Sequence, residues 1–407
     1  MRILHTADWH LGKRLERFSR LEEQRLVLDE ICCIADEQNV DAVLVAGDLF
    51  DTFNPPTEAV ELLYKTLKRL TNNGKRPVIA IAGNHDSPER IDAPDAIARE
   101  CGIFFAGYPD TDLGKIKLDS GVEIVRTEPG FIELQLPSFS YPLRVLITPY
   151  ANEVRLKTML NAESNEDELR NLLQQKWQEL ANNYCDANGV NLLMAHLFFM
   201  KKGETPPDEP DDEKPILHIG GAQAIYSENI PTQIQYVALG HLHRYQTIDT
   251  KPCPVVYSSS PLSYSFSEAG QIKQVAIINI EPAKEVEIQK IALTQGKPLI
   301  RKSFDKVDDA VEWLSTNPDY LVELTIVSDE YLKSTDRKRL EQAHEGIVTL
   351  IPEIKSAPSD ADRGNSSIDL SQDMETLFIQ YFKHRKGQEP NDELLNLFKE
   401  LKAEGNE

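Results

Sequence analysis

The chain has 407 residues, of which 41% are hydrophobic and 27% are charged, and its formal net charge at pH 7 is −22. This length exceeds what one compact core usually supports, so we expect two or three domains. Because the net charge is strongly negative, the chain is not expected to coat nucleic acid or an anionic membrane unaided, and any DNA contact must be local or supplied by a partner.

The first half of the chain alternates strands and helices in the manner of βαβ units, which predicts an α/β fold. Strands are expected at residues 3–6, 42–46 and 78–82, and helices at 21–37, 57–71 and 93–100. A second sheet packed against the first is predicted from short strands at 115–118, 122–126, 131–136 and 143–147. A helix at 166–184 and strands before His196 and at 234–239, 255–257 and 274–280 complete this domain.

The composition changes near Glu281-Pro282, where a small α+β unit is expected to begin. Its predicted elements are strands at 286–293, 321–326 and 347–351 and helices at 307–314 and 333–343. A flexible linker rich in Ser, Asp, Gly and Pro follows at 356–367. The predicted domains are therefore 1–280 and 281–355, with a linker at 356–369 and C-terminal helices at 370–407.

Two amphipathic helices, at 371–383 and 391–402, are expected to end the chain. An apolar stripe on a helix that is tethered by a linker has no core of its own to join. The stripe therefore predicts that the tail docks into a groove on a partner.

Five polar clusters follow the apolar strands of the large domain: Asp8-Trp9-His10, Gly47-Asp48, Gly83-Asn84-His85-Asp86, Ala195-His196 and Gly240-His241-Leu242-His243. Ligands bind at the carboxyl edge of the sheet in α/β proteins, so these side chains should converge there. They offer oxygen and imidazole donors without any thiolate, a set that suits Mn²⁺, Fe²⁺ or Zn²⁺ in an open catalytic site. The clusters together predict a two-metal hydrolase.

The spacing within two of the clusters indicates paired ligands. Asp8 and His10 alternate along an extended chain and should point to the same side, and the same reasoning holds for His241 and His243. Taken alone, each short motif is more often a helix cap, a hydrogen-bonded core histidine or a surface turn. Their joint occurrence at five strand ends favours metal ligation.

Two ions in such a centre lie about 3.5–4 Å apart and need a ligand that bridges them. The carboxylate of Asp48, which follows Gly47 at the end of a strand, is the candidate bridge. Asn84 supplies a neutral carbonyl oxygen and leaves His85 free to protonate the leaving group.

The motifs Asp8-x-His10, Gly47-Asp48-x-x-Asp51, Gly83-Asn84-His85-Asp86, His196 and Gly240-His241-x-His243 resemble the signature of the calcineurin-like metallophosphoesterases. Within that family, residues 1–12 and 47–51 are similar to the SbcD family, the nuclease subunits of the bacterial SbcCD complex, which is the counterpart of the archaeal and eukaryotic double-strand-break nuclease. The signature covers residues 1–280, and the small domain and the tail extend the match over nearly the whole chain. The resemblance implies a two-sheet α/β sandwich core, a small α+β capping domain and a C-terminal helical tail.

The resemblance also implies roles for individual residues. The first metal would be held by Asp8, His10, Asp48 and His243, and the second by Asp48, Asn84, His196 and His241. His85 would contact the scissile phosphate and assist the leaving oxygen, and Asp86 would orient it from behind. The role of Asp51 stays open, because relatives carry either an acidic residue or a histidine there.

The implied activity is that of a metal-dependent DNA nuclease, an exonuclease on duplex ends and an endonuclease on single strands and hairpins, in DNA repair, recombination and replication. Its water nucleophile would be activated between two divalent ions, Mn²⁺ or alternatively Mg²⁺. The implied partners are DNA, an SbcC-type coiled-coil ATPase that receives the C-terminal helices, and a second copy of the chain bound through the phosphoesterase domain. The sequence has no Gly-x-x-x-x-Gly-Lys-[Ser/Thr] loop, so ATP hydrolysis would belong to another chain.

A basic segment follows the first polar cluster closely, and we expect its side chains to reach DNA phosphates. It contains Lys13, Arg14, Arg17 and Arg20. The alternative is an ordinary solvated start of a helix. The acidic run at 208–213 is interpreted as a solvated loop.

The five cysteines are odd in number and lack Cys-x-x-Cys spacing, which favours reduced, buried thiols and a cytoplasmic, nucleoid-associated location. No apolar run approaches about twenty residues, so no membrane association is expected. Two rival functions remain: a metallophosphatase of the same superfamily, and a non-catalytic dimeric scaffold for the ATPase.

Overall fold

The computed structural model describes residues 1–150, 166–207, 224–329, 332–354 and 374–386, together with positions 390, 394, 395 and 398. The chain divides into two compact units: Met1–Lys302 with Asn317–Leu324 and Gly346–Thr349, and Ser303–Thr316 with Thr325–Glu345 and Leu350–Glu407. The predicted linker at 356–367, the acidic run at 208–213 and most of the helix predicted at 391–402 lie outside the described residues.

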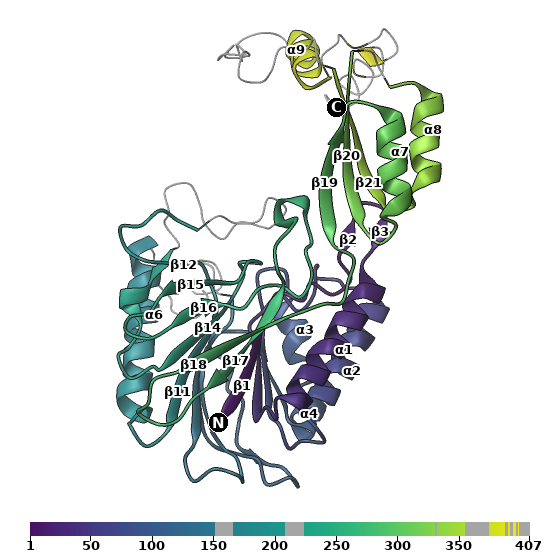
Figure 1. Ribbon diagram of the computed structural model, residues 1–407. Coiled ribbons are helices and arrows are strands. Elements are labelled where there is room, and N and C mark those ends of the chain that lie inside the picture. The colour runs from purple at the N-terminus through teal and green to yellow at the C-terminus, as the bar shows by residue number, and fades with distance from the viewer. Residues whose placement is uncertain are drawn as a thin grey trace. The chain divides into compact units, whose positions relative to one another are not determined.

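A six-stranded sheet in the order β18-β17-β1-β4-β5-β6 forms the first layer of the larger unit (Figure 1). Its strands are β1 (Arg2–Thr6), β4 (Ala42–Val45), β5 (Val78–Ile81), β6 (Ile103–Ala106), β17 (Gln274–Asn279) and β18 (Glu287–Ala292). The pairs β1–β4, β4–β5 and β5–β6 are parallel, whereas β17 is antiparallel to both β1 and β18. The parallel strands are apolar and buried on both faces, as covered parallel sheets require.

An eight-stranded sheet in the order β15-β16-β14-β11-β10-β9-β8-β7 forms the second layer. Its strands are β7 (Ile116–Lys117), β8 (Glu123–Glu128), β9 (Phe131–Gln135), β10 (Leu143–Thr148), β11 (Val190–His196), β14 (Tyr236–Gly240), β15 (Gln246–Asp249) and β16 (Val255–Tyr257). One hydrophobic cluster joins Leu44 and Ile79 of the first sheet to Leu192 and Ala238 of the second. The expected two-sheet sandwich is therefore confirmed.

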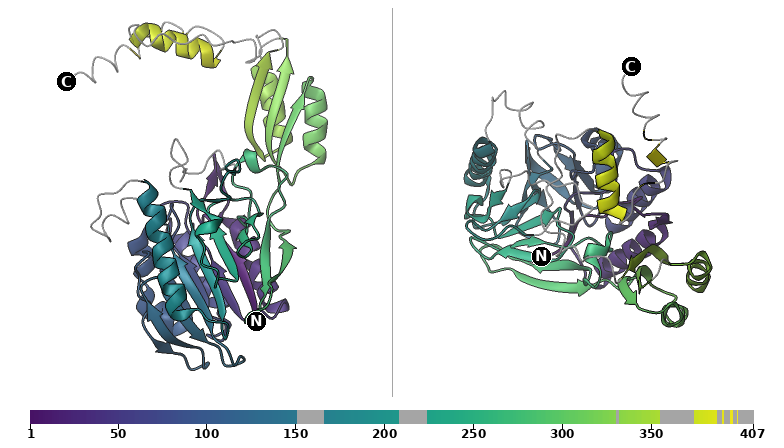
Figure 2. Two further views of the ribbon diagram at one scale, coloured as in Figure 1. Left: turned by 90° about the vertical axis from the view of Figure 1, so that its left-hand side faces the viewer. Right: turned by 90° about the horizontal axis from the view of Figure 1, so that it is seen from above.

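Helices cover the outer faces of the sandwich (Figures 1 and 2). Helices α1 (Leu21–Glu37) and α2 (Thr57–Leu70) pack on the first sheet, and α6 (Glu166–Tyr184) packs on the second through Trp177. The predicted helices at 21–37 and 166–184 have these same bounds. The helix predicted at 93–100 is confirmed only in part: α4 (Asp95–Ala98) and the 3₁₀ turn η1 (Arg99–Cys101) occupy most of it, and a separate helix, α3 (Pro88–Asp92), precedes them. Pro94 separates α3 from α4 because it cannot donate a helical hydrogen bond.

Short elements complete the larger unit. They are the hairpin of β2 (Arg14–Leu15) and β3 (Phe18–Ser19), the pair β12 (Phe199–Met200) and β13 (Ile225–Tyr226), and the 3₁₀ turns η2 (Ser227–Asn229) and η3 (Phe266–Glu268).

The C-terminal part contains a three-stranded sheet in the order β19-β20-β21 with helices α7 and α8. The elements are β19 (Leu299–Phe304), α7 (Val307–Thr316), β20 (Leu321–Ser328), α8 (Ser334–Ala343) and β21 (Ile347–Ile354), and α9 (Met374–Lys386) follows in the tail. The predicted α+β character is confirmed, but the strand predicted at 286–293 belongs elsewhere. It forms β18 and pairs with β17, its neighbour across a short connection, and β19 takes its place in the small sheet.

Among the described residues, no helix is both long enough and apolar enough to cross a bilayer. All five cysteines are free, as predicted, and three of them are buried: Cys32, Cys185 and Cys253. The predicted burial is wrong for Cys33, which is exposed, and for Cys101, which is partly exposed.

Candidate metal centre

The five polar clusters lie at or just beyond the carboxyl ends of β1, β4, β5, β11 and β14, and so come from both sheets of the sandwich. The seven predicted metal ligands are all at least nine-tenths buried: Asp8, His10, Asp48, Asn84, His196, His241 and His243. So many polar side chains are buried together only where hydrogen-bond partners or ions compensate for the loss of their hydration. The structure thus brings together residues from five separate segments of the sequence.

Two imidazole nitrogens face each other in the first predicted ligand group. His10 Nε2 lies 3.0 Å from His243 Nε2 and 3.6 Å from Asp48 Oδ2. Ligands at right angles around an ion, with metal–nitrogen bonds of roughly 2.1 Å, are themselves roughly 3.0 Å apart. The separation of the two histidines therefore fits two neighbouring ligands of one cation.

The second group contains two acceptors that point at each other. His196 Nδ1 lies 2.9 Å from the carbonyl oxygen of Ala46, so in the neutral form that binds a metal Nδ1 carries the hydrogen and Nε2 has the lone pair. Burial lowers the pKa of His196, but without an ion the Asp48 carboxylate raises this pKa to about 9. His196 Nε2 lies 2.8 Å from Asn84 Oδ1 and 3.3 Å from Asp48 Oδ2. A cation shared by these three atoms would remove the repulsion between their lone pairs.

Asp48 occupies the position between the two groups. Its Oδ2 lies within 3.6 Å of His10 Nε2 and within 3.3 Å of His196 Nε2, while its Oδ1 accepts a hydrogen bond from the His85 amide. Burial alone would raise the pKa of Asp48, but the imidazoles of His196, His85 and His10 lower this pKa well below its ordinary value. The carboxylate stays charged, as a bridging ligand must.

Asp8 has a buried carboxylate oxygen that fits a cation. Its Oδ1 accepts a hydrogen bond from the His241 amide at 2.8 Å, whereas its Oδ2 has no hydrogen-bond partner among the described residues. Burial raises the pKa of Asp8 to about 7, although His196 and His243 act to lower it. A positive ion at Oδ2 would stabilise the charged form. The His241 ring lies 5.7 Å from that of His196, on the side of the second group.

The backbone around these ligands is strained. Asp8, His10, Asp48 and His241 have positive φ angles of 56°, 44°, 48° and 113°. Such conformations cost about 1–3 kcal/mol each and gather at functional sites. Gly83 is required because a Cβ atom there would lie 2.1 Å from Asp48 Oδ1.

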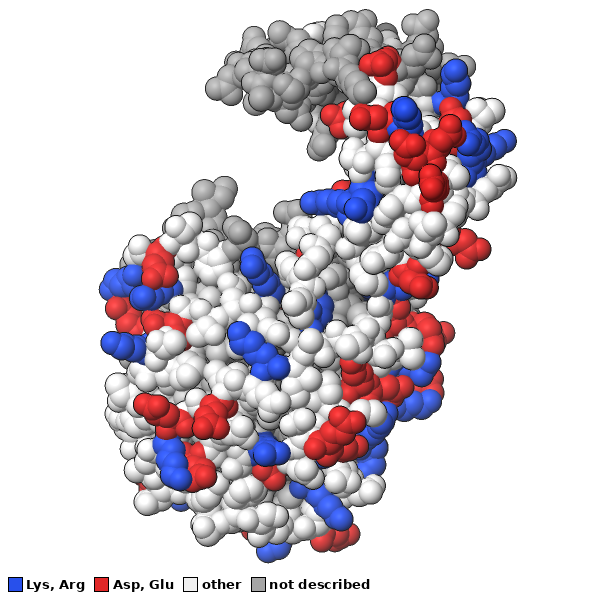
Figure 3. All heavy atoms as spheres, viewed as in Figure 1, with Lys and Arg blue, Asp and Glu red and all other residues white. Residues whose placement is uncertain are grey.

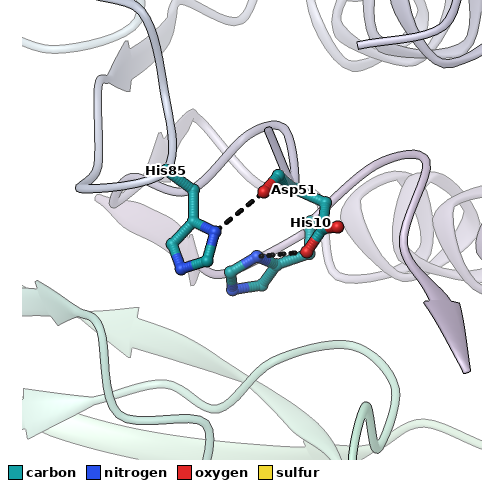
Figure 4. Close-up of side chains that lie close together, drawn as sticks. All are labelled: His10, Asp51 and His85. Carbon is teal, nitrogen blue, oxygen red and sulfur yellow. Dashed lines mark hydrogen bonds and ion pairs between the residues drawn. The ribbon is translucent and has the colours of Figure 1, made fainter. Parts of the chain in front are cut away.

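His85 and Asp51 lie beside the first group (Figure 4). His85 Nδ1 lies 2.8 Å from the carbonyl oxygen of Asp51, and the Asp51 carboxylate lies 3.7 Å from His10 Nδ1 and 3.1 Å from Lys13 Nζ. Burial would raise the pKa of Asp51, but His10 and Lys13 lower it below its ordinary value. Asp51, whose role the sequence left open, therefore connects the predicted catalytic histidine to a predicted ligand.

Asp86 joins the two loops that carry Asp48 and Asn84. Its carboxylate accepts backbone hydrogen bonds from Gly83, Leu49 and Phe50 at 2.8–3.0 Å. Its contribution to the site is therefore to fix the backbone on which His85 stands.

Sequence reasoning missed two buried residues behind His243. Glu268 Oε1 lies 3.2 Å from His243 Nδ1, and the ammonium group of Lys273 forms an ion pair with the same carboxylate. Burial would raise the pKa of Glu268, but Lys273 and His243 lower it well below its ordinary value. The local sequence signal for Glu268 is the capping-box spacing Ser265-x-x-Glu268, which the structure shows in η3, and Lys273 has no such signal.

The model of the calcineurin-like phosphoesterase family matches residues 1–245 of this chain. The chain is 37% identical to the SbcD subunit of nuclease SbcCD from Bacillus subtilis (strain 168), over 98% of its own length and 97% of that protein. It belongs to the SbcD family of calcineurin-like phosphoesterases.

A second relative agrees with this membership. The SbcD subunit of nuclease SbcCD from Rhodobacter capsulatus is 35% identical over 74% of this chain and 71% of that protein. The chain also resembles a solved structure of a dimetal phosphatase from Danio rerio, with 11% identity and a TM-score of 0.41; the match covers 73% of this chain and 99% of that one.

As a calcineurin-like phosphoesterase, the chain is a hydrolytic enzyme that uses divalent metal ions.

The structure corrects one of the four DNA contacts expected for this phosphoesterase. Arg20 is buried, and its guanidinium group binds the carboxylate of Glu23 at 2.8 and 3.0 Å and the Ser263 carbonyl at 2.8 Å. The Arg20 guanidinium group is therefore bound within the protein and is not available to bind a DNA phosphate.

The other three basic residues differ in their surroundings. Lys13 pairs with Asp51, whereas Arg14 and Arg17 are exposed. Arg14 and Arg17 lie on the hairpin of β2 and β3, where the alternative interpretation expected the start of a helix.

Arg20→Gln is expected to destabilise the fold by about 3–5 kcal/mol, because it removes the charged partner of Glu23, whose side chain is only 14% exposed and keeps, among the described residues, only the hydrogen bond from the Lys297 amide. Urea unfolding of the purified variant measures this loss. Arg14→Gln, at an exposed position, is the matched control and should change the free energy of unfolding by no more than ~0.5 kcal/mol. Weakened DNA binding by the Arg20 variant at unchanged stability would contradict the structural role.

Proposed function

We propose that this chain is a metal-dependent DNA nuclease that hydrolyses phosphodiester bonds in DNA repair, recombination and replication. The observation that carries the proposal is the position of Asp48 Oδ2 between His10 Nε2 and His196 Nε2. The relatives from Bacillus subtilis and Rhodobacter capsulatus are named as nuclease subunits, which supports the same conclusion. We propose exonuclease action on duplex ends and endonuclease action on single strands and hairpins.

Two divalent ions would be held by the predicted groups: Asp8, His10, Asp48 and His243 for one, and Asp48, Asn84, His196 and His241 for the other. The oxygen and nitrogen donor set suits Mn²⁺, with Mg²⁺ as the alternative. When bound, two such ions supply activation of water and neutralise charge on the phosphate.

His85 has the role of the general acid in this proposal. Its Nδ1–H donates to the carbonyl oxygen of Asp51, which fixes the orientation of the ring and leaves Nε2 as the atom that exchanges a proton. From Nε2 the proton passes to the oxygen that leaves phosphorus. Asp86 acts indirectly, since it fixes the loop that carries His85.

The proposed partners are DNA, a second copy of the chain and an SbcC-type ATPase. On the face shown in Figure 3, basic and acidic side chains are interspersed, which agrees with local rather than global DNA contact. In the tail, the ring of Phe378 stacks on that of Phe398 at 4.3 Å, so the two tail segments contact each other. We propose that this tail docks on the ATPase, and that the complex acts on the nucleoid in the cytoplasm.

The proposed domain layout differs from the expected one at a single boundary. Because β18 pairs with β17, the nuclease domain extends at least to Ala292 instead of ending at residue 280. The capping domain, the linker at 356–369 and the C-terminal helices then follow in the proposed order.

The test is hydrolysis by the full chain with Mn²⁺, compared between linear duplex, single-stranded DNA and a chromogenic phosphomonoester, with and without the ATPase. DNA should be hydrolysed faster than the monoester. Faster use of the monoester would favour a phosphatase, and no hydrolysis of any substrate would favour a scaffold.

Truncation after Ser367 tests the proposed role of the tail. The shortened chain should hydrolyse short single-stranded DNA at the rate of the full chain but lose the stimulation by ATP on duplex ends. Full ATP stimulation of the truncated chain would contradict docking through the tail.

A further inference from the structure

The loop formed by residues 258–273 lies directly behind the predicted ligand His243. Glu268, at the end of η3, faces His243 Nδ1 at 3.2 Å. Lys273 Nζ donates to the carboxylate of Glu268 and, at 2.8 Å, to the carbonyl oxygen of His243. One acid–base pair therefore holds both the ring and the backbone of a single histidine.

The orientation of Glu268 is fixed from several sides. Its Oε1 accepts hydrogen bonds from the amides of Tyr264 and Ser265 at 3.1 and 3.2 Å. The Tyr264 hydroxyl in turn donates to the carbonyl oxygen of Trp9, the residue between Asp8 and His10. The loop thus contacts both the segment that carries His10 and the segment that carries His243, whose Nε2 atoms lie 3.0 Å apart.

The burial of this pair points to function. Glu268 and Lys273 are 1% and 8% exposed. Taking two charges out of water is costly, and a well-packed apolar pair of similar volume is often as stable or more so. The capping box of η3 needs a hydrogen-bond acceptor at position 268, which glutamine would also supply, so this structural role does not explain the charge, whereas orienting a metal-binding histidine does.

We propose that Glu268 is a positioning residue for the metal ligand His243 and that Lys273 balances its charge. The hydrogen bond from Nδ1–H to the carboxylate directs the Nε2 lone pair toward His10 and makes it a stronger donor. His196 differs, since its Nδ1–H donates to a neutral backbone carbonyl. An ion held by His10 and His243 would therefore depend on Glu268, and an ion held by His196 and Asn84 would not.

The inference rests on the metal assignment of the proposed function, and Mn²⁺ binding in the absence of DNA tests it. Because Glu268→Leu alone would leave the buried ammonium group of Lys273 without the Glu268 carboxylate, the test uses Glu268→Leu with Lys273→Met. Glu268→Gln with Lys273→Met keeps an acceptor for Nδ1–H without a charge. Glu285→Gln, at an exposed glutamate, is the control.

Calorimetry and electron paramagnetic resonance of the full chain should resolve the two ions. In the Leu/Met variant, one of the two should bind about 10–100-fold more weakly, and in the Gln/Met variant the loss should be smaller. His243→Ala should weaken the same ion, and combining it with the Leu/Met pair should add little, because both changes act through one ligand.

The outcomes separate the two claims. If the unchanged protein binds no Mn²⁺, the metal assignment itself is wrong. If the unchanged protein binds two ions and the Leu/Met variant binds both with unchanged affinity, only the role of Glu268 is overturned. Equal weakening of both ions would overturn it as well, since a general structural defect would have that effect.

Discussion

Asp48→Asn is expected to remove binding of both ions and to lower the rate of DNA hydrolysis by at least ~10³-fold. The substitution keeps the volume of the side chain and an oxygen that can accept the His85 amide, but it removes the charge that lies between His10 and His196. A shared ligand stabilises two cations at once, so its loss should weaken binding at both positions. Metal content after Mn²⁺ loading and gel filtration measures the effect, together with initial rates on linear duplex.

Two controls separate charge from fold in this experiment. The melting temperature of the Asp48→Asn protein without metal should fall, because the variant loses the interactions with His196, His85 and His10 that lower the pKa of Asp48, but the protein should still melt cooperatively. Asp119→Asn, at an exposed aspartate, should bind two ions and retain full activity. One tightly held ion in the Asp48→Asn protein would contradict the bridging assignment.

His85→Ala is expected to leave both ions bound and to lower the hydrolysis rate by ~10²–10⁴-fold, the usual contribution of a general acid. The backbone amide of His85 donates to the Asp48 carboxylate, and this hydrogen bond remains in the variant. The contact of the ring Nδ1 with the Asp51 carbonyl oxygen is lost together with the ring. Metal content and single-turnover rates on the same preparation measure the two effects separately.

His5 offers the matched control, because it is equally buried but structural. Its two nitrogens contact the Tyr236 hydroxyl at 2.9 Å and the Leu239 carbonyl at 3.1 Å. His5→Ala should lower the stability of the fold and leave the rate per folded molecule unchanged. Full activity of His85→Ala, or loss of an ion from it, would remove His85 from the proposed role.

The elements that sequence analysis predicted well are those in which local pattern and tertiary packing agree. The helices at 21–37 and 166–184 carry apolar residues at helical spacing, and each has a sheet face to cover. The convergence of the polar clusters was also predictable, since strands of an α/β sheet present their carboxyl ends at one edge.

Most of the predictions that were wrong or missing depend on contacts between residues far apart in the chain, which a single sequence does not show. The strand at β18 was recognised, but the choice between two sheets depends on which edge it meets, and that is a long-range property. Arg20 was grouped with its basic neighbours although Glu23, three residues later, takes up its charge. Glu268 lies 25 residues beyond His243, with no motif to connect them, so only the folded chain reveals the contact.

The central claim is a centre of two ions bridged by one aspartate, and a crystal structure of the Mn²⁺-soaked protein tests it most directly. Anomalous scattering recorded at the manganese edge should show two peaks about 3.5–4 Å apart, both within bonding distance of the Asp48 carboxylate. A single peak, or two peaks of which only one contacts Asp48, would contradict the account.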